Sequence, residues 1–175
     1  MLTFIYKLAD GLSLAASRLA DIAVAVLVCA MVYEVFARYV LHAPTEWAFD
    51  IAYMSNGAIF LLGVAWVLRQ GAHIRIDIVR NRLPKRLVRT AEAIVYLGVL
   101  LPFFGLLGWL AANRAFHAWQ TNEVEMVSPW APLMWPFYLI IAVGLVIMSL
   151  QLLACGLRIA FDHDEQSEQG TGEHA

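Results

Sequence analysis

The chain has 175 residues and a formal net charge of −2; 61% of its residues are hydrophobic and only 15% are charged. Soluble domains usually carry about 25% charged and about 45–50% apolar residues. The composition therefore excludes an ordinary soluble domain, and the weak net charge gives no reason to expect nucleic acid as a partner.

The first twenty residues have the pattern of an amphipathic helix. Apolar residues recur there at helical spacing, whereas Lys7, Asp10 and Asp21 fall mostly on another face. These charges also leave no apolar run long enough for a signal peptide. We expect residues 1–20 to form a helix that lies on the membrane surface, packs on a protein partner, or does both.

Four stretches have the length and apolar character of transmembrane helices. Residues 51–68, 93–113 and 126–157 contain no charge, and residues 22–41 are interrupted by Glu34 and Arg38 near one end. About 20 apolar residues cross a bilayer as a helix. We therefore predict an all-α integral membrane protein with a four-helix membrane domain over residues 21–161. Its spans are expected at about 21–41, 47–68, 91–114 and 133–157.

The distribution of Lys and Arg sets the expected orientation. Seven of the twelve lie between residues 69 and 89, interleaved with apolar residues. This stretch is expected to form an interfacial basic loop on anionic lipid headgroups. By the positive-inside rule it faces the cytoplasm, and four spans then place both termini there. Residues 162–175 read as a disordered acidic tail.

Motifs for catalysis and cofactor binding are missing from the sequence. No phosphate-binding loop, hydrolase elbow or zinc motif is present, and no histidine lies in mid-span to ligate haem. Cys29 and Cys155 lie inside apolar runs without metal-ligand spacing, so we expect them to be small buried hydrophobes. We predict no enzyme activity, no cofactor and no metal site.

The charges that are most costly to place are Glu34, Arg38, Glu46 and Asp50. Glu34 and Arg38 are four residues apart, so we expect them to pair, and reversing both charges should rescue what either single reversal damages. Because the first two spans are antiparallel over a short connection, the four charges should gather at its outer end. They form either a structural ion-pair cluster or a site for an ion, a proton or a partner's charge.

A more specific signal runs from Glu46 to Val79. It comprises Glu46-Trp47, Asp50, a Leu-Gly pair at 62–63 and the string Arg69-x-Gly71-x-His73-Ile74-x-Ile76-Asp77. With four spans and inside termini, this pattern resembles the small membrane subunit of tripartite ATP-independent periplasmic (TRAP) transporters, the DctQ-like family. The resemblance covers roughly residues 15–160.

The resemblance implies a multi-pass subunit of the bacterial inner membrane. In such systems a soluble periplasmic binding protein captures an organic anion, typically a carboxylate or sugar acid, and a large membrane subunit carries it inward with sodium. The small subunit would brace the large one and enlarge the docking surface for the binding protein, with membrane lipids around it. By this resemblance Glu46, Trp47 and Asp50 act at the periplasmic rim, and Arg69, His73 and Asp77 fix the cytoplasmic turn.

Two other functions remain open from the sequence. The chain is either an independent proton-coupled transporter that uses Glu34, or a membrane anchor or assembly subunit of another complex, such as an electron-transfer enzyme. Against the first, Arg38 lies one helical turn from Glu34 and opposes proton exchange there.

Overall fold

The computed structural model describes residues 2–70 and 85–161, which are helical apart from the connections and one isolated β-bridge. The elements are α1 (Leu2–Tyr39), α2 (Ala48–Arg69), α4 (Lys85–Ile94), the π-helix η1 (Val95–Leu100), α5 (Leu101–Thr121) and α6 (Trp135–Phe161). Within these described ranges, four helical stretches are long and apolar enough to cross a membrane: Tyr6–Tyr39, Ala48–Leu68, Thr90–Thr121 and Trp135–Ile159. The predicted all-α membrane fold is confirmed.

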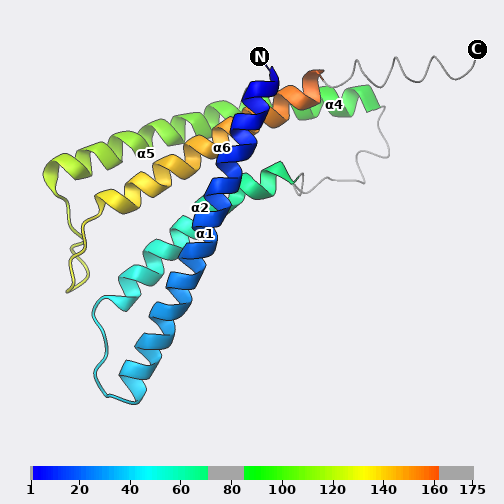
Figure 1. Ribbon diagram of the computed structural model, residues 1–175. Coiled ribbons are helices and arrows are strands. Elements are labelled where there is room, and N and C mark those ends of the chain that lie inside the picture. The colour runs from blue at the N-terminus through cyan, green and yellow to red at the C-terminus, as the bar shows by residue number, and fades with distance from the viewer. Residues whose placement is uncertain (1, 71–84, 162–175) are drawn as a thin grey trace, which may run out of the picture.

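The helices form two hairpins that pack through α2 and α6. α1 pairs with α2, α5 pairs with α6, and α1 also crosses α6 near the N-terminus. Figure 1 shows the hairpins diverging from this crossing. We call the end with connections 40–47 and 122–134 the hairpin end. The end with the first turns of α1 and the last turns of α6 is the terminal end.

α1 is one unbroken helix, without a boundary between the expected surface segment and the first span. In its N-terminal half Ala9, Ser13, Ala16 and Ala20 are buried, at the spacing of one helix face. That face packs within the protein because small residues let α1 approach its neighbours closely. A position of residues 1–20 on the membrane surface stays a prediction.

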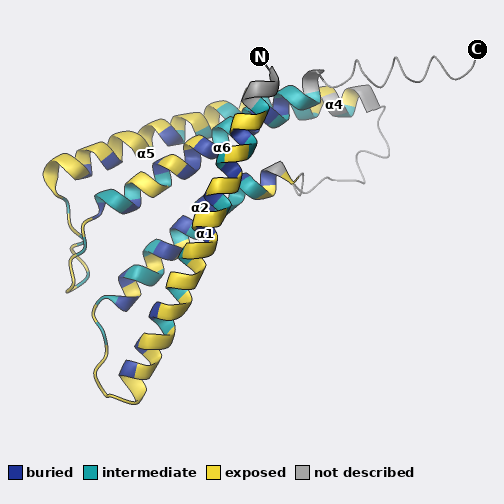
Figure 2. Ribbon diagram, in the orientation of Figure 1, coloured by how far each residue is buried: buried dark blue, intermediate teal, exposed yellow. Residues whose placement is uncertain are grey.

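The core lies where α1, α2 and α6 meet. It joins small residues of α1 and α2 to larger side chains of α2 and α6: Ala16, Ala20, Ala58, Leu62, Ala65, Leu68, Ile147, Met148 and Leu152. Figure 2 shows that burial concentrates along α2 and α6, whereas α5 is largely exposed. In the most apolar 18-residue windows, half of the α6 span is buried but only 6% of the third span. The third span therefore presents most of its apolar surface outside the chain.

α2 and α6 approach closely at Gly144. A Cβ atom there would lie 3.0 Å from the Leu61 Cβ and 3.3 Å from the Leu61 carbonyl carbon. The contact includes backbone, which cannot swing aside as a flexible side chain can. Gly144 therefore sets the distance between the two hairpins.

The third span contains a π-helical turn that the sequence analysis did not anticipate. In η1 the backbone N–H of Leu101 donates to the Tyr96 carbonyl, five residues back. Pro102 follows at once, and it has no N–H and would crowd the carbonyl four residues earlier. The wider turn fits this proline inside a helix and keeps backbone groups bonded, as a membrane requires.

Connection 122–134 is held in a compact shape. Asn122 ends α5 in the left-handed conformation with φ 48°. Glu125 donates its N–H to the Pro132 carbonyl and Met134 donates to the Glu123 carbonyl, each at 2.9 Å. These bonds fix the register of the turn, and α6 then begins at Trp135. The proline-rich start of the fourth apolar stretch is thus an ordered turn and not part of the helix.

Candidate functional site

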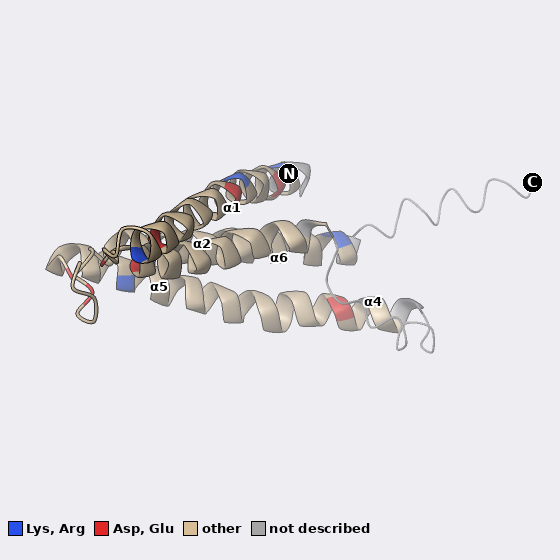
Figure 3. Cartoon of the chain, turned by 90° about the horizontal axis from the view of Figure 1, so that it is seen from below, with Lys and Arg blue, Asp and Glu red and all other residues tan. Residues whose placement is uncertain are grey.

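Polar contacts concentrate at the two ends of the molecule. Figure 3 shows long uncharged stretches of α5 and α6, with charged residues toward their ends. Such a distribution suits helices whose middles lie in hydrocarbon. The hairpin end and the terminal end are therefore the two candidate sites.

At the hairpin end, Glu34 fixes the chain reversal after α1. Its Oε1 accepts hydrogen bonds from Arg38 Nε at 2.9 Å and Nη2 at 2.5 Å, so the expected ion pair is present. Its Oε2 accepts from the backbone N–H of Thr45 at 2.9 Å and from the Thr45 hydroxyl. Because both oxygens are used and the residue is 7% exposed, Glu34 links α1 to the start of α2.

Trp47 reinforces the same reversal. Its ring stacks on Tyr33 of α1, with ring centroids 5.7 Å apart and planes 23° from parallel. Trp47 occupies the N-cap of α2 but its side chain caps no backbone group. Its contribution is therefore aromatic packing between the two helices of the first hairpin.

Asp50 contacts the second hairpin. It lies in the first turn of α2, where the helix dipole favours a negative charge, and it is 5% exposed. Its Oδ2 accepts a hydrogen bond from the Ser128 hydroxyl of connection 122–134, and the Ser128 oxygen accepts the N–H of Trp130 at 3.2 Å. The four charges expected in one group thus divide: Glu34 pairs with Arg38, whereas Asp50 joins the two hairpins.

A groove opens between the two connections beside Asp50. Its volume is about 440 Å³, and its lining comprises Glu46, Phe49, Asp50, Tyr53, Glu125, Val127, Ser128 and Pro129. Glu46 is exposed, as is Arg38, but Arg38 is paired with Glu34. Three carboxylates in one groove make it acidic.

Arg114 closes the second hairpin beside this groove. Its Nη2 lies 2.5 Å from Glu123 Oε1, and its guanidinium lies over the Tyr138 ring at 5.0 Å from the centroid. These contacts tie the end of α5 to connection 122–134 and to α6. The sequence analysis did not single out Arg114.

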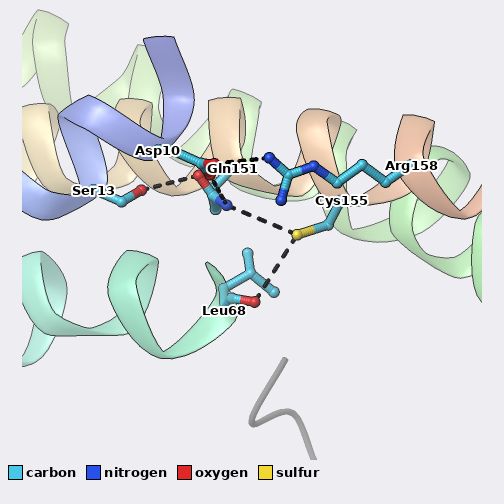
Figure 4. Close-up of polar contacts among 6 residues, drawn as sticks. All are labelled: Asp10, Ser13, Leu68, Gln151, Cys155 and Arg158. Atoms are coloured by element: carbon cyan, nitrogen blue, oxygen red, sulfur yellow. Dashed lines mark hydrogen bonds and ion pairs between the residues drawn. The ribbon is translucent and has the colours of Figure 1, made fainter. Parts of the chain in front are cut away.

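At the terminal end, Gln151 joins α6 to α1 inside the protein. Its Oε1 accepts a hydrogen bond from the Ser13 hydroxyl at 3.0 Å, and its Nε2 donates to Asp10 Oδ1 at 3.3 Å. Gln151 and Ser13 have no exposed surface. Figure 4 shows both α1 side chains directed at the Gln151 amide. A buried amide is thereby satisfied by a helix far away in sequence.

The same network extends toward α2 and the end of α6. Arg158 Nη2 lies 2.8 Å from Asp10 Oδ2, and the guanidinium stands over the Tyr6 ring at 4.8 Å. The Cys155 thiol contacts the Leu68 carbonyl oxygen at 3.9 Å (Figure 4). Three helices therefore meet in one polar cluster, which consists of Asp10, Ser13, Leu68, Gln151, Cys155 and Arg158.

Sequence reasoning missed this cluster. Asp10 had been assigned to the polar face of a surface helix, and Gln151 was passed over although it interrupts a long apolar stretch. The expectation for the cysteines is wrong for Cys29, which is exposed, and Cys155 is only partly buried. A membrane helix keeps apolar side chains on its outer face, so an apolar run does not indicate burial within the chain.

The expected cytoplasmic turn is only partly visible. Arg69 is the last residue of α2. His73 and Asp77 lie outside the described residues. The roles assigned to these three residues stay predictions.

The described helices and polar ends define a small multi-pass membrane protein. In this part of the chain no group of His, Cys, Asp and Glu side chains is arranged to hold a metal ion. The sequence model of the DctQ component of tripartite ATP-independent periplasmic transporters matches residues 4–160, so the chain belongs to this family. It is a family of transporter components and not of enzymes. Searches of curated proteins and of solved structures found no match.

Proposed function

We propose that the chain is the small permease subunit that supports the large membrane subunit of a TRAP transporter and the docking of its periplasmic binding protein. The system would take up an organic anion, a carboxylate or sugar acid, by sodium symport. Membership of the DctQ family supports a role in a transporter of this class.

The observation that carries the supporting role is the open surface of the third span. Only 6% of its most apolar window is buried within the chain. Phe103, Leu106, Trp109 and Leu110 of α5 are all more than half exposed. A helix with so little contact inside its own chain has a large face for lipid or for a second membrane protein. We assign part of this face to the large subunit.

We further propose that both termini are cytoplasmic in the inner membrane and that the hairpin end faces the periplasm. The excess of Lys and Arg between residues 69 and 89 supports this orientation. In it, Glu46, Trp47 and Asp50 lie at the periplasmic rim. Arg69, His73 and Asp77 would fix the cytoplasmic turn.

The arrangement of Glu34 argues against an independent proton-coupled transporter. Its Oε1 accepts hydrogen bonds from Arg38 and its Oε2 accepts from Thr45. A carboxylate that cycles protons needs access to a pathway, and this one is enclosed by its own hairpin.

Purification in mild detergent tests the subunit role. The chain is expressed with its native genomic neighbours, captured, and analysed by mass spectrometry. The proposal expects one large polytopic partner in equal amount. Recovery of the chain alone, as monomer or dimer, would contradict it.

Uptake into proteoliposomes tests the transport role and the coupling ion. Candidate carboxylates and sugar acids are offered with the binding protein and an inward sodium gradient. Uptake should require this chain, the large subunit and sodium. Equal uptake without this chain, or with a proton gradient alone, would contradict the corresponding part of the proposal.

A further inference from the structure

The groove at the hairpin end holds the carboxylates that the chain does not neutralise. Residues 34–50 and 114–134, which form this end, contain five carboxylates and two arginines. Arg38 pairs with Glu34 and Arg114 with Glu123, so both arginines are occupied outside the groove. The remaining three line it: Glu46, Asp50 and Glu125. Within the described residues, none of these three forms an ion pair with Lys or Arg.

The three carboxylates differ in the hydrogen bonds that they accept from the rest of the chain. Asp50 accepts the Ser128 hydroxyl and is nearly buried, so it shapes the wall of the groove. The one hydrogen bond that the Glu125 side chain accepts from the described residues comes from the backbone N–H of Val127, at 3.3 Å. Among the described contacts Glu46 has none. Like charges placed together repel, and a cation entering between them relieves that repulsion.

The rim of the groove points to a protein rather than a free cation. Met126 and Val127 of connection 122–134 are each 91% exposed, and Phe49 is 76% exposed. Met126 and Val127 follow the last residue of α5, so they stand beyond the helical part of the span. Exposed apolar side chains beside a charged groove are typical of protein contact surfaces, and methionine adapts readily to a partner.

We infer that this groove accepts arginine or lysine side chains of the soluble periplasmic binding protein, while Met126 and Val127 pack against apolar atoms beside them. The inference rests on the proposed function, which places the hairpin end in the periplasm. Charge complementarity selects the partner surface, and the groove of about 440 Å³ admits long cationic side chains. The binding protein should therefore dock through a basic patch.

A binding measurement on the assembled complex tests the inference. The chain and its large subunit are placed together in nanodiscs, and the affinity for the soluble binding protein is measured at low and high salt. The double variant Glu46→Gln, Glu125→Gln should bind about tenfold more weakly at low salt, mainly through slower association. The difference should shrink at high salt because ions screen exposed charges. Asp50 is left intact because it holds connection 122–134.

A matched control removes the same number of charges away from the groove. The double variant Asp21→Asn, Glu92→Gln changes carboxylates of α1 and α4 outside the hairpin end. It should bind like the unchanged complex. If control and groove variants weaken binding equally, net charge alone drives docking and the inference is overturned.

Crosslinking tests whether the groove contacts the binding protein, lipid or the large subunit. A photoreactive residue in place of Val127 should link to the binding protein. Links to lipid or to the large subunit instead would overturn the inference, as would unchanged affinity of the groove variant.

The two proposals fail in different ways. If the groove variant still holds the large subunit but binds the soluble protein normally, only the groove assignment fails. If the unchanged chain holds no large subunit, the proposed function fails and the inference fails with it.

Discussion

The two polar ends of the molecule use their charged groups differently. At the terminal end Asp10 of α1 binds both Gln151 and Arg158 of α6, which lie 141 and 148 residues further along the chain. At the hairpin end Glu34 and Arg38 pair within one helix, and three carboxylates remain around a groove. Polar groups that form hydrogen bonds or ion pairs within the chain stabilise the fold, whereas carboxylates without an ion pair can bind a partner.

Changes at the terminal end should lower the stability of the isolated chain, and changes at the groove should alter binding with little effect on stability.

The largest effect is expected at the contact between the hairpins. Gly144→Leu inserts a side chain where a Cβ would already lie 3.0 Å from Leu61 and close to its backbone. Overpacking of this kind costs about 1–3 kcal/mol of unfolding free energy. The measurement is unfolding of the purified chain in mixed micelles. Gly105→Leu is the control, because a Cβ at Gly105 meets nothing within 4 Å. Equal destabilisation by both variants would contradict a close contact at Gly144.

The next effect is expected at the buried amide of the terminal end. Gln151→Leu removes the partner of the Ser13 hydroxyl and a partner of Asp10. Hydrogen bonds between membrane helices are worth about 0.6–2 kcal/mol, so a loss in this range is expected in the same unfolding assay. Ser149→Ala is the control on the same helix, because that hydroxyl donates to the Leu145 carbonyl four residues back and not to another helix among the described residues. If Ser149→Ala loses as much stability as Gln151→Leu, the interhelical hydrogen bonds of Gln151 contribute nothing measurable to the unfolding free energy.

A smaller effect is expected from the ion pair beside that amide. Asp10 and Arg158 lie 2.8 Å apart with side chains 23% and 32% exposed, whereas Arg18 and Asp21 lie 4.0 Å apart and are more than 70% exposed. A double-mutant cycle on Asp10 and Arg158 should give a coupling near the upper end of about 0.2–1 kcal/mol, because the pair is partly shielded from solvent. The cycle on Arg18 and Asp21 should give almost none. A larger coupling for the exposed pair would contradict the structural difference.

The sequence predicted local features better than long-range ones. Glu34 and Arg38 are found as a pair because spacing on one helix fixes their distance. Membrane helices were found because length and hydropathy are local quantities. The network of Asp10, Gln151 and Arg158 depends on how α1 crosses α6, and neither spacing nor hydropathy encodes that crossing. The distinction between a lipid-facing and a buried apolar position, as at Cys29, is hidden for the same reason.

The π-helical turn and the groove illustrate the same limit. Pro102 inside an apolar run is a signal for a local irregularity, but it does not say whether the helix kinks, ends or widens. Glu46 and Asp50 were singled out from sequence, whereas Glu125 was not. It joins them only because connection 122–134 folds back toward α2.

The smallest stability effect is expected at Arg38, the exposed partner of Glu34, and here the structure sharpens the sequence-based expectation. Glu34 accepts hydrogen bonds from both Arg38 and Thr45, whereas within the described part of the chain the Arg38 side chain bonds to Glu34 alone. Glu34→Ala should therefore lower the melting temperature of the chain more than Arg38→Ala. In Glu34→Ala the exposed Arg38 side chain is hydrated after the loss of its partner. The Thr45 N–H, however, loses the acceptor that holds the chain reversal between α1 and α2.

The double reversal Glu34→Arg, Arg38→Glu tests which bond matters. If the ion pair alone stabilised the reversal, the swapped pair would restore the melting temperature completely, as the sequence spacing suggests. In the structure the Thr45 N–H needs an acceptor at position 34, and an arginine there offers none. Rescue should therefore be partial, with Thr45→Ala adding little further loss to the swapped protein. Complete rescue would show that the helix pair, and not the bond to connection 40–47, stabilises this end.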